Sequence, residues 1–120
     1  MKRKKPITNK MKEKASRLYE FMKSQHGYVT KAQIGAYLGI LDERSVRDVI
    51  SLLATKKPII STSDSKGYKL ARTIDDLDEV EHTWAELSSR IEELEKRIAP
   101  LILFRDACLG LKNHIKTLDK

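Results

Sequence analysis

The sequence contains few of the residues that mark a secreted or membrane-embedded protein. Cys108 is its single cysteine, which excludes an internal disulfide and favours the reducing cytoplasm as the location. Five glycines and three prolines among 120 residues, with 40% apolar residues, predict that most of the chain folds. No apolar run approaches the ~20 residues that a membrane span requires, and the opening MKRKK lacks the apolar segment of a signal peptide. We therefore expect a cytoplasmic protein that does not bind membranes.

Residues with catalytic or metal-binding chemistry are also scarce. His26, His82 and His114 lie far apart in the sequence and lack partners at the spacing of metal ligands. Cys108 and His114 are six residues apart, so on a helix they face different ways, and Cys108 is interpreted as a small core residue. The glycines occur singly rather than in a phosphate-binding loop. We therefore predict no enzymatic activity, no metal, no cofactor and no small-molecule ligand.

Charge is distributed unevenly along the chain. The net charge of +7 combines 17 Lys/Arg and 6 Asp/Glu in residues 1–73 with 7 Lys/Arg and 11 Asp/Glu in residues 74–120. The first part thus carries +11 and the second −4. This asymmetry favours a polyanionic partner for the first part, although lysine-rich faces also occur where a small domain only needs solubility.

The first 39 residues predict two helices. Thr8 is a candidate N-cap for the first, whose apolar stripe recurs at steps of 4, 3 and 4: Met11, Ala15, Leu18 and Met22. Thr30 and Gln33 form a capping-box pattern that begins the second helix, and Gly39 permits a tight turn after it. The inward face of the second helix is predicted to comprise Ile34, Tyr37 and Leu38.

A third, amphipathic helix is predicted to begin after Asp42, a candidate N-cap whose charge suits the positive end of a helix. Its core-facing residues recur at steps of 3, 1 and 3: Val46, Val49, Ile50 and Leu53. This leaves five residues pointing outward: Glu43, Arg44, Arg47, Asp48 and Ser51. Such a face is also what an ordinary solvated helix presents.

A β-hairpin is predicted next. Pro58 ends the third helix, because the residue before a proline avoids helical geometry. Residues 59–63 favour a strand, residues 64–67 have turn chemistry, and residues 68–70 resume the alternation. A hairpin this short must pack on the helices to be stable.

Residues 42–70 resemble the N-terminal DNA-binding domain of the bacterial biotin operon repressors and, more broadly, bacterial and phage winged-helix transcription regulators. The resemblance rests on core-spaced Val46, Ile50 and Leu53, then an extended segment, then the run KGYKL at residues 66–70. It implies that the helix after Asp42 enters a DNA major groove and that the hairpin tip contacts the flanking backbone. The ligase part of that family is missing here, so neither ligase activity nor biotin binding is implied.

The DNA contacts that this resemblance implies lie on the second and third helices and on the hairpin. They are Lys31, Gln33, Glu43, Arg44, Ser45, Arg47, Asp48, Ser51, Lys66 and Lys69.

The C-terminal part contains an unbroken heptad seam. Its residues recur at alternating steps of 3 and 4: Leu77, Val80, Trp84, Leu87, Ile91, Leu94, Ile98 and Leu101. The small first domain has too little surface to cover such a seam, which favours self-association over packing of this helix on its own domain. In a parallel pair Arg90 and Glu95 of opposite chains would attract whereas Asp76 and Glu81 would repel, so the orientation stays open.

Pro100 is expected to break or kink this helix. After it the seam resumes out of register in a further helix: Leu101, Phe104, Cys108, Leu111, Ile115 and Leu118. Ile102, Leu103 and Leu109 make this helix apolar on more than one side. That breadth suggests a hairpin or a four-helix bundle in the dimer. Gly110 is an alternative end point.

The predicted fold is mainly α: a three-helix winged helix-turn-helix with a β-hairpin wing, then a long coiled-coil-like helix and a further helix. Residues 1–73 are the predicted DNA-binding domain with a basic tail, and residues 74–120 the predicted dimerisation segment. The favoured function is sequence-specific binding of double-stranded DNA by a transcriptional regulator that forms a homodimer or a dimer of dimers. We expect this regulator to be a repressor. The alternative is a protein–protein adaptor in a replication or phage assembly.

Overall fold

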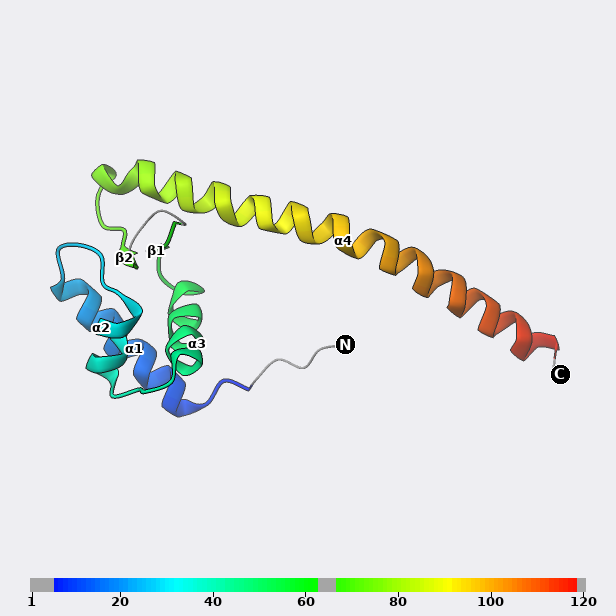
Figure 1. The fold of residues 1–120 in the computed structure, drawn as a ribbon, viewed down its shortest axis with the longest axis horizontal. Helices are drawn as coiled ribbons and strands as arrows, with labels where there is room; N and C mark the ends of the chain where they lie inside the picture. Colours follow the sequence, from blue (N-terminus) through cyan, green and yellow to red (C-terminus); the bar gives the residue numbers. More distant parts are fainter. Residues whose placement is uncertain (1–5, 63–66, 119–120) are drawn as a thin grey trace. The chain divides into compact units, whose positions relative to one another are not determined.

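The protein is mainly helical with one small antiparallel sheet (Figure 1). The computed structural model describes residues 6–62 and 67–118, and it divides into two compact units between Thr83 and Trp84. In chain order the elements are α1 (Asn9–Ser24), α2 (Lys31–Leu38), α3 (Glu43–Ala54), β1 (Ile59–Ile60), β2 (Lys69–Leu70), the 3-10 helix η1 (Ile74–Asp76) and α4 (Leu77–Leu118).

Each of the first three helices begins at the side chain that the sequence predicts as its cap. The Thr8 hydroxyl accepts from the Met11 N–H, and Thr30 forms a complete capping box with Gln33. The Asp42 carboxylate accepts from the Ser45 N–H. These bonds satisfy backbone N–H groups that have no partner inside the helix, so helix starts are set locally.

The core lies where α1, α2 and α3 meet. Its members include the predicted stripes of all three helices: Ala15, Leu18, Met22, Ile34, Leu38, Val46, Val49, Ile50 and Leu53. Tyr37 was expected to face this core, but it is 43% exposed and its ring stacks on Phe21 with centroids 4.3 Å apart. An aromatic ring can cover a neighbouring ring at the rim of a core while its edge stays in water.

The hairpin is fixed to the helical core by a third extended segment. In the sheet Ile59 pairs with Leu70, and Ile60 is buried. Val29, just before α2, forms an antiparallel bridge with Tyr68, with both N–H···O=C distances at 2.8 Å. The expected strand pairing is therefore confirmed, whereas the expected turn tip at residues 64–66 lies outside the described residues.

The first unit extends past the predicted boundary at Thr73, because η1 and the first turns of α4 pack on the hairpin. Thr73 caps η1, and the buried Asp76 carboxylate accepts from the Arg72 and Thr73 N–H groups at 2.8 and 3.3 Å. The buried Thr83 hydroxyl accepts from the Ser61 N–H at 3.2 Å. These hydrogen bonds satisfy polar groups beside the hairpin that would otherwise be buried without a partner.

α4 is one helix from Leu77 to Leu118. Of the break or kink expected at Pro100 the break is therefore wrong, as is the separate further helix. Of the hairpin or four-helix bundle suggested for the last segment, the hairpin is wrong. Proline removes one N–H and crowds one turn of a helix. In a helix of 42 residues the neighbouring turns keep their own hydrogen bonds, so a single defect is tolerated. Gly110 does not end the helix either.

Candidate nucleic-acid interface

α3 presents two different faces. Val46, Val49 and Ile50 are buried in the core, whereas Arg44, Arg47 and Ser51 are exposed. The 3.6-residue period of the helix separates these two sets of residues. The Asp42 cap and the turn before it determine where this helix begins, and Gly39 in that turn has φ 71°, a conformation that suits glycine.

Three of the predicted contact residues form an ion network instead of projecting independently. The Glu43 carboxylate accepts from Lys31 Nζ at 2.8 Å and from Arg47 at 3.0 Å, so it links α2 to α3. The hydrogen bonds from Lys31 and then Arg47 lower the pKa of Glu43 to about 2. The network keeps two cations close together at the start of α3 and leaves it with a net positive charge.

The remaining predicted residues of the two helices differ in how available they are. Arg44 is exposed and has no hydrogen bond or ion pair with any described residue. The Gln33 side chain accepts from the Thr30 N–H in the capping box, although the residue is exposed. Ser45 and Asp48 are half-buried and line a small hollow between α1 and α3. Arg44 is therefore the cation on α3 that needs no rearrangement to meet a ligand.

The two predicted hairpin contacts have separate outcomes. Lys66 lies outside the described residues. Lys69 Nζ is paired with Asp76 Oδ1 at 3.0 Å and Glu79 Oε1 at 3.5 Å, and only 24% of its side chain is exposed. Glu79 also accepts a hydrogen bond from the Tyr28 hydroxyl. These contacts favour a structural role for Lys69, as a brace between β2 and the start of α4, over a phosphate contact.

A second cationic surface surrounds Tyr19 on α1, and sequence reasoning did not single it out. Lys23 Nζ and Lys57 Nζ each lie 4.6 Å from the centre of its ring. Lys12 and Lys56 line the adjoining hollow and form no ion pair with any described residue. Much of the positive charge of the first unit therefore lies outside the outward face of α3.

A broad hollow of about 830 Å³ lies between α2 and the start of α3. Small residues on α2 leave the space, and the lining includes Ala32, Gly35, Ala36 and Ile40. Leu41 beside it is fully exposed. The three small residues Ala32, Gly35 and Ala36 within five positions of α2 are the signal that could have indicated this hollow from the sequence.

No protein-family model, curated protein or solved structure matches this chain. Across the described ranges, no three His, Cys, Asp or Glu side chains lie close enough together to hold a metal ion. None of the helices in those ranges combines the length and the apolarity needed to cross a bilayer.

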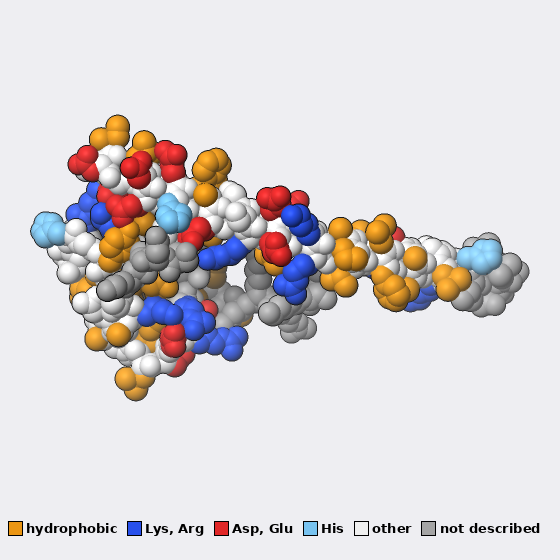
Figure 2. All heavy atoms as spheres, turned by 45° about the horizontal axis from the view of Figure 1, so that its top comes forward, with side chains coloured by type: hydrophobic (Ala, Val, Ile, Leu, Met, Phe, Trp, Pro, Cys, Tyr) orange, Lys and Arg blue, Asp and Glu red, His pale blue; other side chains and the backbone are white. Residues whose placement is uncertain are grey.

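The predicted dimerisation residues line one side of α4. Val80 is half-buried, and the other seven are between 47% and 69% exposed: Leu77, Trp84, Leu87, Ile91, Leu94, Ile98 and Leu101. Figure 2 shows further hydrophobic side chains gathered along the distal part of α4, where Ile102, Leu103, Phe104, Leu109 and Leu111 are also exposed. Within one chain this apolar surface stays in contact with water, which is typical of an association surface.

Proposed function

We propose that this protein is a winged helix-turn-helix that binds double-stranded DNA sequence-specifically, as a dimeric transcriptional repressor. The order of elements supports this: α2, a turn at Gly39, α3 and then a hairpin. The bridge between Val29 and Tyr68 ties the hairpin to the start of α2. The observation that carries the proposal is the two-faced α3, which packs one side into the core and exposes Arg44 and Arg47 on the other.

In this proposal α3 lies in the major groove. Arginine reads guanine through two hydrogen bonds, to O6 and N7, and Arg44 is free to do so at once. Arg47 must first share or release Glu43, to which it is bonded at 3.0 Å. Lys31 at the first turn of α2 must likewise share Glu43, to which it is bonded at 2.8 Å, when it contacts a phosphate. The carboxylates of Glu43 and Asp48 are acceptors for cytosine N4.

Lys69 has no DNA contact in this proposal, because its ammonium group is held by both Asp76 and Glu79 and only 24% of its side chain is exposed. The role that remains for it is to hold the hairpin against the start of α4.

The exposed seam of α4 supports self-association as a dimer or a dimer of dimers. Two copies related by two-fold symmetry would recognise an inverted repeat.

The test is a titration of the full chain against fluorescent duplexes. One duplex carries the sequence that flanks the protein's own coding region, and another of equal length carries random sequence. Each phosphate neutralised contributes about −0.9 to the slope of log affinity against log salt. With roughly four to six contacts per protomer, affinity should fall by orders of magnitude between about 50 and 200 mM salt. No binding at low salt, or a flat salt response, overturns the proposal.

Arg44→Ala separates sequence readout from charge in the same titration. If Arg44 reads a guanine, the variant weakens binding to the preferred duplex by about 1–3 kcal/mol more than binding to the random duplex. Lys12→Ala is the control, since it removes one unpaired cation from α1 in the same unit. It should affect both duplexes alike and only slightly. Equal losses with both variants on both duplexes mean that α3 is not the reading helix.

A protein–protein adaptor is the second candidate, and the hollow between α2 and α3 favours it. Its lining is largely apolar or small, and the neighbouring Leu41 is fully exposed. Such a surface suits an apolar side chain of a protein partner better than a phosphate. Absence of duplex binding combined with loss of a protein partner in Leu41→Ser would support this candidate.

A further inference from the structure

The continuity of α4 through Pro100 places both halves of its apolar stripe on one helix. Around the midpoint between Arg97 and Ile98 the stripe is symmetric in sequence apart from Ile98 itself, whose mirror position is Arg97, because its other members fall at equal separations on either side. The matched positions are 94 with 101, 91 with 104, 87 with 108, and 84 with 111. Two steps of 3 follow one another, from Ile98 to Leu101 and from Leu101 to Phe104, and interrupt the alternation of 3 and 4. This interruption is what makes the two halves of the stripe mirror each other.

This symmetry allows a second copy to pair in the opposite direction with the seam residues on either side of the centre opposite one another. At the centre Ile98 faces Arg97 of the second copy. The layers would be Trp84 with Leu111, Leu87 with Cys108, Ile91 with Phe104, and Leu94 with Leu101 of the second copy. Each layer joins a larger residue to a smaller one or two of similar size, which suits a constant distance between helix axes. A parallel pair in register would instead place tryptophan on tryptophan and cysteine on cysteine.

The charge along α4 also favours an antiparallel pair, because the two halves of the helix carry opposite net charge. Residues 74–98 contain nine Asp/Glu and three Lys/Arg, a net charge of −6, whereas residues 99–120 contain two Asp/Glu and four Lys/Arg, a net charge of +2. An antiparallel pair brings the acidic half of each copy against the basic half of the other, with Glu81 near Lys112 beside the seam. A parallel pair gains Arg90 with Glu95 but puts the two acidic halves together.

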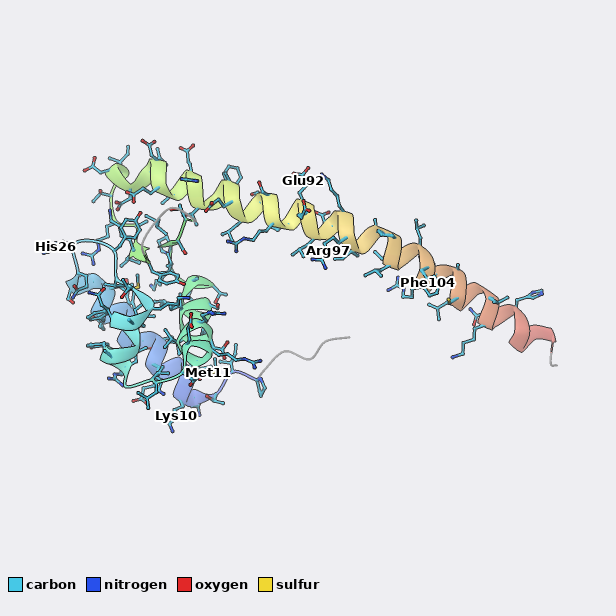
Figure 3. The ribbon with its side chains drawn as sticks, in the orientation of Figure 1. Lys10, Met11, His26, Glu92, Arg97 and Phe104 are labelled. Carbon is cyan, nitrogen blue, oxygen red and sulfur yellow. The ribbon has the colours of Figure 1, made fainter. Side chains whose placement is uncertain are left out.

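We propose that α4 pairs antiparallel with α4 of a second copy, centred between Arg97 and Ile98. The proposal rests on the self-association in the proposed function and specifies its geometry. Phe104 and Arg97 leave α4 on the same side, and Glu92 leaves it on a different side (Figure 3), so Arg97 lies on the seam side, where it faces Ile98 of the second copy. The two N-terminal units are then attached at opposite ends of the paired helices rather than side by side at one end.

Cys108 is exposed, so its interpretation as a core residue is wrong for the single chain. It makes the orientation measurable, because it lies in the seam and is the single cysteine of the sequence. A disulfide needs its two Cβ atoms about 3.5–4.5 Å apart, so only facing positions cross-link. Wild type, Leu87→Cys, and Leu87→Cys with Cys108→Ala are each oxidised mildly, and covalent dimers are mapped by peptide mass. Antiparallel pairing predicts a strong 87–108 cross-link in Leu87→Cys and only background dimer in the other two proteins.

The opposite pattern overturns the proposal: cross-linking of wild type through Cys108, and of the double variant through position 87, means parallel pairing. Light scattering on the reduced proteins separates this from failure of self-association itself, since a monomeric wild type removes the proposed dimer in either orientation. If Leu87→Cys alone weakens the dimer, Ile91→Cys with Phe104→Cys in a Cys108→Ala chain repeats the test one layer further in. A 91–104 cross-link supports the antiparallel pair, and 91–91 and 104–104 cross-links overturn it.

Discussion

At the scale of single residues, Gly67 sets how closely the hairpin approaches the start of α2. A Cβ at this position would lie 2.2 Å from the Val29 carbonyl oxygen, well inside van der Waals contact. Both of the backbone hydrogen bonds between Val29 and Tyr68 depend on that approach. Glycine is therefore needed here for space, beside a bridge that joins segments far apart in sequence.

We predict that Gly67→Ala lowers the free energy of unfolding by about 1–3 kcal/mol, because the hairpin must shift away from Val29. Gly27→Ala is the matched control, since a Cβ there has no atom within 4 Å. Urea denaturation of the two variants and wild type measures the difference. Equal midpoints for both variants would show that the Val29 bridge contributes little to stability.

Asp76 is a second residue that stabilises the fold, through the hydrogen bonds that its carboxylate accepts. Hydrogen bonds from the Arg72 N–H, then Lys69, then the Thr73 N–H lower the pKa of Asp76 to about 2 from its ordinary 3.8. A group with a lowered folded pKa stabilises the protein above its unfolded pKa, and this stabilisation is lost as pH falls through the folded value.

We therefore predict that wild type is more stable than Asp76→Asn at pH near 6, and that this gap narrows as pH falls from about 4 toward 2. Asp78→Asn, which changes an exposed carboxylate in the first turn of α4, serves as the comparison and should show a smaller gap throughout. Unfolding midpoints measured across this pH range give the answer. A gap that stays constant with pH would mean that the ionised carboxylate is not what stabilises the junction.

At the scale of elements, α4 differs most from the first three helices. α1, α2 and α3 each bury one face in a shared core, whereas the second unit leaves its apolar stripe exposed. Most helical stability in proteins comes from packing an apolar face rather than from propensity. A long helix with an uncovered stripe and an internal proline therefore gains most from a partner.

Replacing Leu87 and Leu94 with lysine would put four charges into the seam of a dimer. Their desolvation costs more than such a seam can absorb, so we predict that the helices separate while the first unit stays folded. Light scattering should report a monomer, and thermal unfolding of the first unit should be unchanged. Glu92→Lys with Glu93→Lys adds the same number of lysines outside the seam and should leave the dimer intact. Dissociation by both pairs would indicate that charge alone, and not the seam, controls association.

At the scale of the whole molecule, the folded first unit needs more of the chain than its three helices and hairpin. Asp76 and Thr83 supply hydrogen-bond acceptors to the hairpin and its neighbours, and both are buried. A domain boundary at Thr73 would remove them, while a boundary at Thr83 keeps them.

We predict that a chain ending at Thr83 folds as a monomer and is more stable than one ending at Thr73 by about 2 kcal/mol or more. The estimate counts hydrogen bonds worth roughly 0.5–1.5 kcal/mol each, and more where a charge takes part. Both truncated chains lack the seam from Trp84 onward, so both should bind DNA weakly, as single half-site readers. Equal denaturation midpoints would place the boundary at Thr73 after all.

What the sequence determined by itself is local. The caps at Thr8, Thr30 and Asp42, the tight turn at Gly39 and the buried face of α3 each depend on residues within a few positions of one another, so spacing alone reveals them. The candidate site was predictable to the same extent: α3 presents Arg44 and Arg47 outward because its period requires it.

Only the tertiary structure decided which charges are already paired. Lys69 and Lys31 look equally available in the sequence, yet Lys69 braces the hairpin against Asp76, and Lys31 of α2 is bonded to Glu43 of α3, 12 positions away. The Tyr28–Glu79 bond likewise joins residues 51 positions apart. Propensity and spacing carry no information on such distances, since a side chain's electrostatic partner is whichever group the completed fold brings within reach.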